Sequence, residues 1–422
     1  MNKTEWTLSQ GADALLLQHA QRAFPGNTPA KIGVAVSGGS DSLALLHLCA
    51  RVQAHRGGQV RAVTVDHRLR PEGAKEARAV AAFCKTLGIR HDTLVWQHGA
   101  IAGNLQDQAR RARYALIGDW ARMNDIGHVV LGHTADDQAE TFLMELAREA
   151  GIDGLSGMRR NWTDDGIAWA RPLLDERRDG LRAYLARHDI SWIDDPSNAD
   201  QRFARVRARG ALKALQPLGI TTETLNSVVR NLQSVRQTVQ VATADAGDRI
   251  AKTSAGELVF DRREFQRLPE EVMRRLLAGS LRWVSGEKYA PRHASLTRVQ
   301  AAVRDIRDKT LSGCRIRVSE TEIRIVREPK AVAGLETASQ ALWDDRWRLV
   351  GPHDRRLTVR ALGTEGLRQC DDWRATGHSR SALIVSPAIW RGATLIAAPL
   401  AGMGNAWTAE IVASFHSFLL SH

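Results

Sequence analysis

Short apolar runs and amphipathic stretches alternate along the first third of the chain. The residues Ile32–Val36 are all apolar or small and predict a buried strand, and an amphipathic helix pattern follows up to Arg56. The alternation continues with strands at 60–65, 90–96 and 128–131 and helix patterns at 71–87, 104–122 and 134–148. This order is typical of a doubly wound, mostly parallel α/β sheet, which is the fold class that we predict.

The pattern changes beyond this alternating region. Helical periodicity is found at 8–23, 176–188, 222–251 and 269–282, and strand-like runs at 346–350, 357–361, 381–386 and 394–398, after a linker-like stretch at 329–339. We therefore predict an N-terminal helix within 1–28, an α/β domain over 29–217, a mainly helical domain over 218–330 and a small β-rich or α+β domain over 340–422.

The first predicted strand runs into a turn rich in glycine and serine. Its residues are Ser37, Gly38, Gly39, Ser40, Asp41 and Ser42. Glycines let the backbone approach an anion, and the unpaired N–H groups at the start of the following helix favour negative charge, so the turn is suited to phosphate. The lysine of the common GxxxxGK[ST] loop is absent, and so is GxGxxG. A serine-capped turn without a ligand is the structural alternative.

Ligands of doubly wound sheets bind beyond the carboxyl ends of the strands. This rule selects four groups of residues, which we expect to line one cleft. They are Ser37–Ser42, Asp66–Arg68, the loop 96–104 and Gly132–His133.

Three acids follow His133 at the start of a predicted helix. Thr134 is placed to cap this helix, and Asp136, Asp137 and Glu140 fall in its first turns. Acids are stable at a helix N-terminus for purely structural reasons, which is one reading of them. In the predicted cleft, three carboxylates facing phosphate would need a cation between them, and Mg²⁺ is the cation whose ligands are carboxylate and phosphate oxygens.

Composition narrows the class of protein. The chain has 422 residues, 43% of them hydrophobic, with no apolar run long enough for a membrane span and no secretory pattern at its start. Its four cysteines are dispersed, which argues against a disulfide framework or a zinc site and fits a cytoplasmic protein. The formal charge of +12 and a pI near 10.1 favour a polyanionic partner such as nucleic acid.

Arginines are concentrated between 159 and 209. Arg177, Arg178 and Arg182 have acidic neighbours at helical spacing, whereas the later members of the segment have few acids near them in the sequence after Asp200. We therefore expect phosphate contacts from the later group. Three tryptophans of the region are candidates for stacking on bases or for the core: Trp162, Trp169 and Trp192.

Several motifs resemble a known family. SGGSDS resembles the PP-loop of the N-type ATP pyrophosphatases, whose sheet is Rossmann-like, of the adenine nucleotide alpha hydrolase type. The longer motifs VDHRLRPEGAKEA, NLQDQARRARY, GHTADDQAETFLMELAREAGIDGLSGM and RPLLDERRDGLRAYLARHDISWIDDPSNADQRFARVRAR resemble the tRNA(Ile)-lysidine synthetases over about 31–215. Beyond Pro217 the resemblance fades, although it agrees with members that carry extra tRNA-contacting domains.

The resemblance implies a two-step, ATP-dependent ligation. ATP adenylylates the wobble cytidine of an isoleucine tRNA with anticodon CAU, releasing diphosphate, and the ε-amine of free lysine then displaces AMP to leave lysidine. The codon that is read changes from AUG to AUA. A homodimer stays open, as do two alternatives: a thiolating PP-loop enzyme, and a non-catalytic RNA-binding protein with a vestigial loop.

On this interpretation Ser37–Ser42 hold the departing diphosphate, and Asp41 acts through Mg²⁺, with Asp136 as a second candidate ligand. The nucleotide is lined by His67, Gly132 and His133. Arg113 matches the family position for a cation at the α-phosphate.

Lysine poses a protonation problem, because its ε-amine has a pKa of about 10.4 and is almost entirely charged at neutral pH. A carboxylate can bind the ammonium and then accept its proton, so Asp137 and Glu140 are the candidates for lysine binding and catalysis. His133 is an alternative base.

The candidates for tRNA contact are Arg202, Arg205, Arg207 and Arg209. The family's usual RNRLR reads Arg205-Val206-Arg207-Ala208-Arg209 here, so one polar side chain is missing from that turn.

Overall fold

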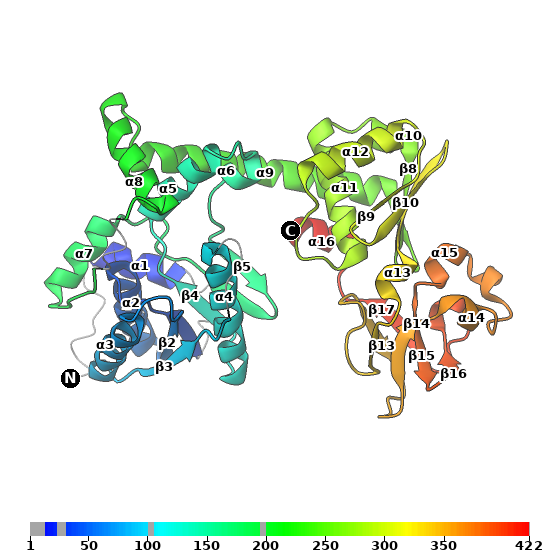
Figure 1. The fold of residues 1–422 in the computed structure, drawn as a ribbon, viewed down its shortest axis with the longest axis horizontal. Coiled ribbons are helices and arrows are strands. Elements are labelled where there is room, and N and C mark those ends of the chain that lie inside the picture. The colour runs from blue at the N-terminus through cyan, green and yellow to red at the C-terminus, as the bar shows by residue number, and fades with distance from the viewer. Residues whose placement is uncertain (1–12, 23–30, 100–104, 195–199, 422) are drawn as a thin grey trace. The chain divides into compact units, whose positions relative to one another are not determined.

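The computed structural model describes residues 13–22, 31–99, 105–194 and 200–421. The chain divides into two compact units, Met1–Ser234 and Val235–His422 (Figure 1). Each unit has its own sheets and its own apolar clusters. The described part of the chain contains no helix that is both long and apolar enough to cross a membrane.

A six-stranded sheet forms the centre of the first unit. Its strands are β1 (Lys31–Ala35), β2 (Gln59–Asp66), β3 (Arg90–Val95), β4 (His128–Leu131), β5 (Asn161–Asp164) and β6 (Ile167–Ala170). Their order is β3-β2-β1-β4-β6-β5, and every neighbouring pair is parallel except β5 and β6. The predicted fold class is therefore confirmed, with an antiparallel edge hairpin that the sequence pattern did not indicate.

Helices cover both faces of this sheet, as Figure 1 shows. On one face, α1 (Ala14–Arg22), α2 (Ser40–Arg56), α3 (Gly73–Thr86) and α7 (Arg178–Arg187) share an apolar cluster with β1. On the other face, α4 (Leu105–Met123) packs Ile117 and Trp120 against β4 and β6. The sheet is thus covered on both sides, which explains why its central strands β1 and β4 are mostly apolar.

A separate helical layer follows β4 in the chain. It consists of α5 (Ala135–Leu146), α6 (Ile152–Leu155), α8 (Ala204–Leu215), η3 (Gln216–Leu218) and the start of α9 (Thr222–Ile250). Phe142 of α5, Leu212 of α8 and Val229 of α9 belong to one apolar cluster. We expected the α/β domain to end near Pro217, whereas the first compact unit ends at Ser234, inside α9.

The second unit contains more sheet than the predicted mainly helical domain over 218–330. Its first sheet has the order β7-β8-β11-β10-β9. The strands are β7 (Ala251–Ser254), β8 (Glu257–Asp261), β9 (Lys309–Leu311), β10 (Cys314–Val318) and β11 (Glu322–Arg327). The helices that accompany this sheet are α10 (Arg262–Gln266), α11 (Glu270–Ser285), α12 (His293–Arg304) and α16 (Phe415–Ser421). These strands are three to six residues long, which is too short for a clear alternating pattern.

The remainder of the second unit is built from short elements. Its strands are β12 (Glu336–Ala338), β13 (Trp347–Val350), β14 (Thr358–Ala361), β15 (Pro387–Arg391), β16 (Thr394–Ala397) and β17 (Thr408–Ile411), and its helical turns are α13 (Pro329–Val332), α14 (Gly363–Leu367), η4 (Trp373–Thr376), α15 (Arg380–Leu383) and η5 (Pro399–Ala401). Two expectations were wrong here. The stretch 329–339 is not a linker, because α13 and β12 form in it, and 381–386 is not a strand, because Ser379 caps α15 by accepting from the Ala382 N–H.

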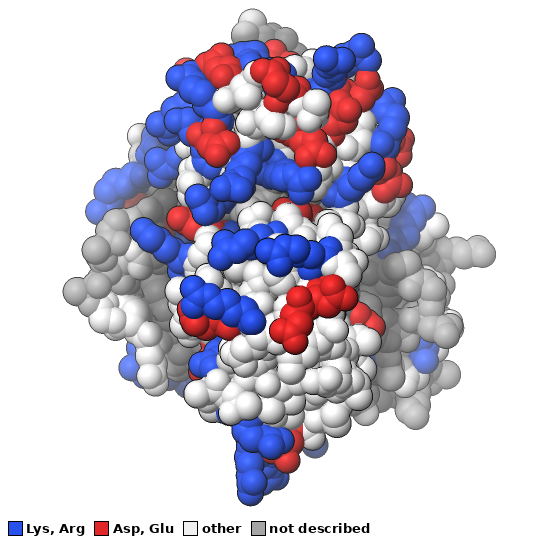
Figure 2. Space-filling model, turned by 90° about the vertical axis from the view of Figure 1, so that its right-hand side faces the viewer, with Lys and Arg blue, Asp and Glu red and all other residues white. Residues whose placement is uncertain are grey.

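Acidic and basic side chains alternate on the face in Figure 2, above an uncharged area. Ion pairs within one helical turn are common in the second unit, as between Arg267 and Glu264 and between Arg368 and Glu365. The net charge of the chain therefore does not form one basic patch on this face.

A buried ion cluster ties α1 to the rest of the first unit. The carboxylate of Asp13 accepts hydrogen bonds from Arg51 Nη1 at 3.0 Å, Arg187 Nη2 at 2.8 Å and His188 Nε2 at 2.7 Å. Further along α1, His19 pairs with Glu176, just before α7. The cluster thus joins α1 to α2 and to both ends of α7.

Replacing Asp13 with Asn should lower the free energy of unfolding by about 3 kcal/mol, because the buried Arg51 would lose the charged carboxylate that it contacts. The control Asp119→Asn, which breaks an exposed pair with Arg122, should cost less than about 1 kcal/mol.

Burial alone would raise the pKa of Asp13, but hydrogen bonds from Arg187, His188 and Arg51 lower it to about 2. The stabilisation is therefore complete above about pH 4 and is lost as the pH falls toward 2. Urea unfolding at pH 7 and pH 3 measures both effects, and a gap between wild type and variant that widens at pH 3 would contradict the assignment.

Candidate active site

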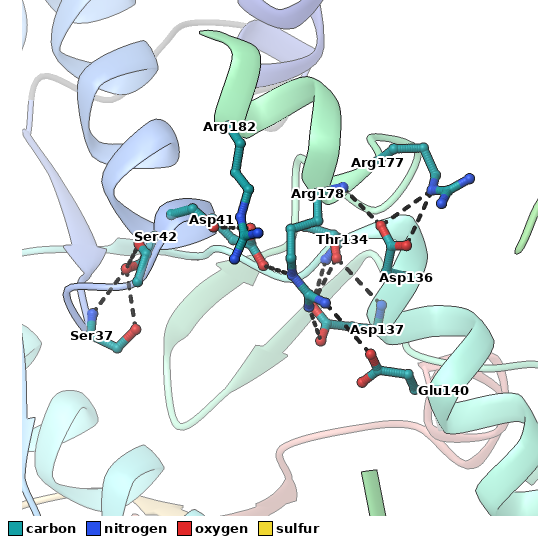
Figure 3. A network of polar contacts seen from close by, with 12 residues as sticks. Ser37, Asp41, Ser42, Thr134, Asp136, Asp137, Glu140, Arg177, Arg178 and Arg182 are labelled. Atoms are coloured by element: carbon teal, nitrogen blue, oxygen red, sulfur yellow. Dashed lines mark hydrogen bonds and ion pairs between the residues drawn. The ribbon is translucent and has the colours of Figure 1, made fainter. Parts of the chain in front are cut away.

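The glycine turn lies where β1 meets α2 (Figure 3). Gly38 has φ of +90°, a conformation that other residues rarely adopt, and a Cβ atom there would lie 2.9 Å from Ile193 Cδ1. The hydroxyl of Ser42 accepts from the Ser37 N–H at 3.1 Å and donates to the Gly39 carbonyl at 3.0 Å. Ser42 therefore closes the turn in the structure, and no side chain caps the start of α2.

The acids at the start of α5 are held by a capping box. Thr134 accepts from the Asp137 N–H, and Asp137 Oδ2 accepts from the Thr134 N–H at 2.9 Å and from its hydroxyl at 3.0 Å. The role of Asp137 in capping α5 thus uses one of its two carboxylate oxygens, Oδ2. Its Oδ1 faces Arg178.

Arg178 brings the glycine turn and the acids together, as Figure 3 shows. Its Nε donates to Asp41 Oδ2 at 2.9 Å, its Nη2 to Asp137 Oδ1 at 3.2 Å, and its Nη1 lies 3.6 Å from Glu140 Oε1. At Gly132, a Cβ atom would lie 2.9 Å from Ser42 Cα, so the two motifs also touch through their backbones. Both predicted motifs therefore face one cleft at the carboxyl ends of β1 and β4.

The charges of this cluster perturb one another. Burial raises the pKa of Asp41 and of Glu140, and their arginine partners offset only part of that rise. Burial works to lower the pKa of Arg178, but the charges of Asp41 and Asp137 outweigh it, so this pKa is raised. Arg178 therefore stays charged, and it acts as an internal counter-ion for the acids.

The two predicted metal ligands differ in what they already bind. Asp41 accepts from two side chains, the Ser40 hydroxyl and the Arg178 guanidinium. Asp136 accepts from the Arg178 backbone N–H at 2.8 Å and from Arg177 Nε at 3.2 Å, so it supports the start of α7. Asp41 fits a divalent cation better than Asp136 does.

A second group of charges lies beside the acids and consists of cations. Arg113 is enclosed, its Nε has no hydrogen-bond partner among the described residues, and burial lowers its pKa. The cations Arg110 and Arg205 act on it through space. His67 has a pKa lowered by burial and by Arg113, and its Nδ1 likewise has no partner in the described part of the chain. An uncompensated, desolvated guanidinium is suited to binding an anion.

A cavity of about 680 Å³ reaches the acids from the side of α8. Asp136 and Glu140 contribute to its wall, and so do the cations Arg177, Arg207 and Lys213. A ligand with a positive end and a negative end would find partners of both signs in it.

The four arginines predicted to bind tRNA do not share one surface. Arg209 Nε binds Glu140 Oε1 at 2.5 Å, and Arg205 Nη1 lies 4.0 Å from Asp137 Oδ1. Arg202 and Arg207 are exposed; Arg202 pairs with Asp200, and Arg207 donates to two backbone carbonyls. The sequence did not indicate the acidic partner of Arg209, because Glu140 is 69 positions away from it.

The tryptophans belong mainly to the core. Trp169 is buried and stacks on Trp162 with ring centroids 5.8 Å apart, and Trp192 packs against the apolar cluster of α2 and α7. The end of the predicted loop 96–104 lies outside the described residues.

Sequence reasoning missed the role of Arg178, for which we considered only acidic neighbours at helical spacing. Its position offered one signal. A cation in the first turn of a helix is disfavoured by the helix dipole, so Arg177 and Arg178 at the start of α7 needed acids from elsewhere.

Comparison with known proteins identifies similar chains. A model of the PP-loop domain matches residues 12–215. The tRNA(Ile)-lysidine synthase of Ruegeria pomeroyi is 45% identical over 96% of this chain and 98% of its own length. The tRNA(Ile)-lysidine synthase of Hyphomonas neptunium is 40% identical over 74% of this chain and 86% of its own length. Among solved structures, the tRNA thiolase NcsA of Methanococcus maripaludis has a TM-score of 0.47 at 14% identity, over 53% of this chain and 78% of that one, which is too weak a likeness to add to the assignment.

Proposed function

Since the chain belongs to the tRNA(Ile)-lysidine synthase family, and is therefore an ATP-dependent ligase that modifies tRNA, we propose that it joins free L-lysine to the wobble cytidine of an isoleucine tRNA with anticodon CAU. ATP activates the cytidine carbonyl oxygen as an adenylate and releases diphosphate. The ε-amine of lysine then displaces AMP. These substrates meet in the cytoplasm, where we propose that the enzyme works.

One observation carries the proposal: a single guanidinium, that of Arg178, contacts both Asp41 of the glycine turn and Asp137 of α5. A group of the same charge, such as the ammonium of lysine, could bind to the same acids. In the first step, the backbone N–H groups of Gly38–Ser40 face the departing diphosphate, and Arg113 offsets charge on the α-phosphate.

Lysine is expected to enter through the cavity beside α8. Its ammonium would take the place of the Arg178 guanidinium at Asp137 and Glu140, and its carboxylate would find cations at the cavity wall, where Arg207 and Lys213 lie. Glu140 has a pKa raised by burial, which makes it a better proton acceptor than an exposed glutamate. Asp137 or Glu140 would take the proton that lysine must lose.

Mg²⁺ is the cation that we propose for Asp41. When bound, it would neutralise the diphosphate and so assist its departure. Asp41 would hold it once the Arg178 side chain has left this carboxylate.

The alternative of a thiolating enzyme finds no support at this site. The four cysteines are all buried, each in an apolar surrounding that raises the pKa of its thiol, as for Cys49 and Cys84, where it reaches about 12. A sulfur carrier needs a reactive thiolate, which these environments disfavour.

The proposed function is tested with α-labelled ATP and tRNA transcripts, with and without lysine. We expect AMP release only when lysine and a transcript with anticodon CAU are both present. A transcript with its first anticodon base changed to U is the matched control. AMP release that does not depend on lysine would contradict the proposal, and release with the control transcript would contradict the anticodon assignment.

Binding of tRNA should weaken steeply with salt, because basic side chains that contact phosphates release counter-ions. We expect Arg202→Gln and Arg207→Gln each to make the slope of log Kd against log salt shallower by about 1. Filter binding at four salt concentrations measures the slope. The control is Arg122→Gln on α4, whose partners are Asp119 and Asp165. Unchanged slopes in both variants would remove Arg202 and Arg207 from the tRNA contact.

A further inference from the structure

His133 and Arg171 form a buried pair at the edge of the cleft. The Nε of Arg171 donates to Nδ1 of His133 at 3.1 Å. Both side chains are buried, with 8% of His133 and 4% of Arg171 exposed. His133 directly precedes Thr134, the cap of the helix that carries the acids.

The other contacts of Arg171 fix its guanidinium. Its Nη2 donates to the Tyr114 hydroxyl at 3.0 Å, its Nη1 donates to the Arg159 carbonyl, and its Cζ atom lies 4.1 Å from the ring centroid of Trp162. Each nitrogen thus has a partner of its own, and the group has little freedom to turn.

This geometry determines the tautomer of His133. Arginine nitrogens only donate hydrogen bonds, so Nδ1 of His133 must accept and cannot carry a proton. The ring proton therefore sits on Nε2. Within the part of the chain that the structure describes, Nε2 makes no hydrogen bond, so its N–H is available to a ligand.

The surroundings oppose a second proton on the ring. Burial lowers the pKa of His133 well below its ordinary value, and the charges of four arginines lower it further. These arginines come from three segments of the chain: Arg110 and Arg113 from α4, Arg171 after β6, and Arg205 from α8. The Tyr114 hydroxyl is the remaining titratable group at the pair.

We propose that Arg171 is a positioning residue, which holds His133 as the neutral Nε2–H tautomer so that the imidazole donates a hydrogen bond to an oxygen of the nucleotide or of the adenylylated base. The proposal rests on the proposed function for the identity of that oxygen. It removes His133 from the candidates for the base, because the nitrogen that could accept a proton is occupied by Arg171.

The proton balance of the second step then involves the acids alone. Attack by the ε-amine forms a carbon–nitrogen bond at the cytidine ring and breaks the carbon–oxygen bond to AMP, which leaves with both electrons of that bond. The proton that lysine loses before the attack goes to a carboxylate of α5, Asp137 or Glu140. His133 stays neutral throughout.

The first test needs no substrate. Long-range ¹H–¹⁵N correlation spectra of the whole protein with labelled histidine distinguish the two neutral tautomers from the charged ring, and the signal that is missing in His133→Gln identifies His133 among the 14 histidines. We expect the Nε2–H tautomer without titration between pH 5.5 and 8. An Nδ1–H tautomer, or a midpoint near pH 6.5, would overturn the proposal.

A pair of amide substitutions separates a donor from a base. The amide of Gln reaches the position of Nε2 and can donate there, whereas the shorter amide of Asn reaches only the position of Nδ1. We expect His133→Asn to lower the rate of diphosphate release about 100-fold and His133→Gln to lower it only about tenfold. Neither amide is a base, so equal losses would contradict the donor role.

Arg171→Met tests the positioning role separately. It removes the donor from Nδ1 and one nearby charge, so the pKa of His133 should rise and its titration should move into the observable range of the same spectra. A His133 signal that is unchanged in Arg171→Met would overturn the role of Arg171. Failure of lysine-dependent AMP release would refute the proposed function without changing these spectra, whereas a titrating His133 would refute this inference alone.

Discussion

Asp137→Asn is expected to leave the first step of the reaction working and to stop the second. The amide oxygen can still accept from the Thr134 N–H, so the cap of α5 is kept, but the negative charge that would bind the lysine ammonium is lost. Diphosphate release should continue up to one equivalent per tRNA. Lysine-dependent AMP release should fall about 1000-fold, because both ammonium binding and proton transfer depend on the charge.

Two comparisons sharpen this result. Glu145→Gln removes an acid from the same helix whose partner is Arg148, and it should release AMP at the wild-type rate. Asp41→Asn should suppress diphosphate release as well as AMP release, while tRNA binding persists. Normal AMP release by Asp137→Asn would exclude Asp137 from the mechanism, and normal diphosphate release by Asp41→Asn would exclude Asp41.

Gly132→Ala is expected to displace the glycine turn, which we propose to bind the phosphates of ATP. The added Cβ atom would lie 2.9 Å from Ser42 Cα and 3.0 Å from the Asp41 carbonyl oxygen, and both are backbone atoms that cannot turn away. The glycine turn would have to shift against β4. A displacement of this kind can cost about 100-fold in rate, so we expect at least that loss in diphosphate release and weaker ATP binding.

The matched control is Gly127→Ala, just before β4, where a Cβ atom would meet nothing within 4 Å. It should bind ATP like the wild type in equilibrium dialysis. If Gly132→Ala also keeps its ATP affinity and its rate, the turn is not held in place by this contact.

The fold could be predicted where the local pattern is strong. The central strands β1 and β4 are short apolar runs, because both faces of the sheet are covered by helices there, and the alternation of strands and helices along the chain led to the correct fold class. The hairpin of β5 and β6 was missed because each strand has four residues and Trp162 and Trp169 also fit a loop that stacks on bases. In the second unit, Ser379 was a capping signal inside a stretch that we interpreted as a strand.

The motifs of the candidate site could be recognised in the sequence, but the ion pairs between its acids and arginines could not. Gly38, Asp41 and Asp137 were found because their neighbours in the sequence explain their chemistry. The partners of the acids, Arg178 and Arg209, lie 137 and 69 positions away from Asp41 and Glu140. No local pattern indicates a contact over such a distance, so only the structure shows that these arginines pair with the acids.

The contacts of α1 have a practical meaning for anyone who trims this protein for expression. Asp13 binds Arg187 at the end of α7, and His19 pairs with Glu176 just before α7 begins. The backbone carbonyl of Glu176 also accepts the first N–H of α5. A shorter version that began after Arg22 would retain every group that we assign to the chemistry. It would nevertheless lose the contacts of Asp13 and His19 that fix the position of α7, the helix that begins with Arg178. An inactive truncation would therefore say nothing about the catalytic groups themselves.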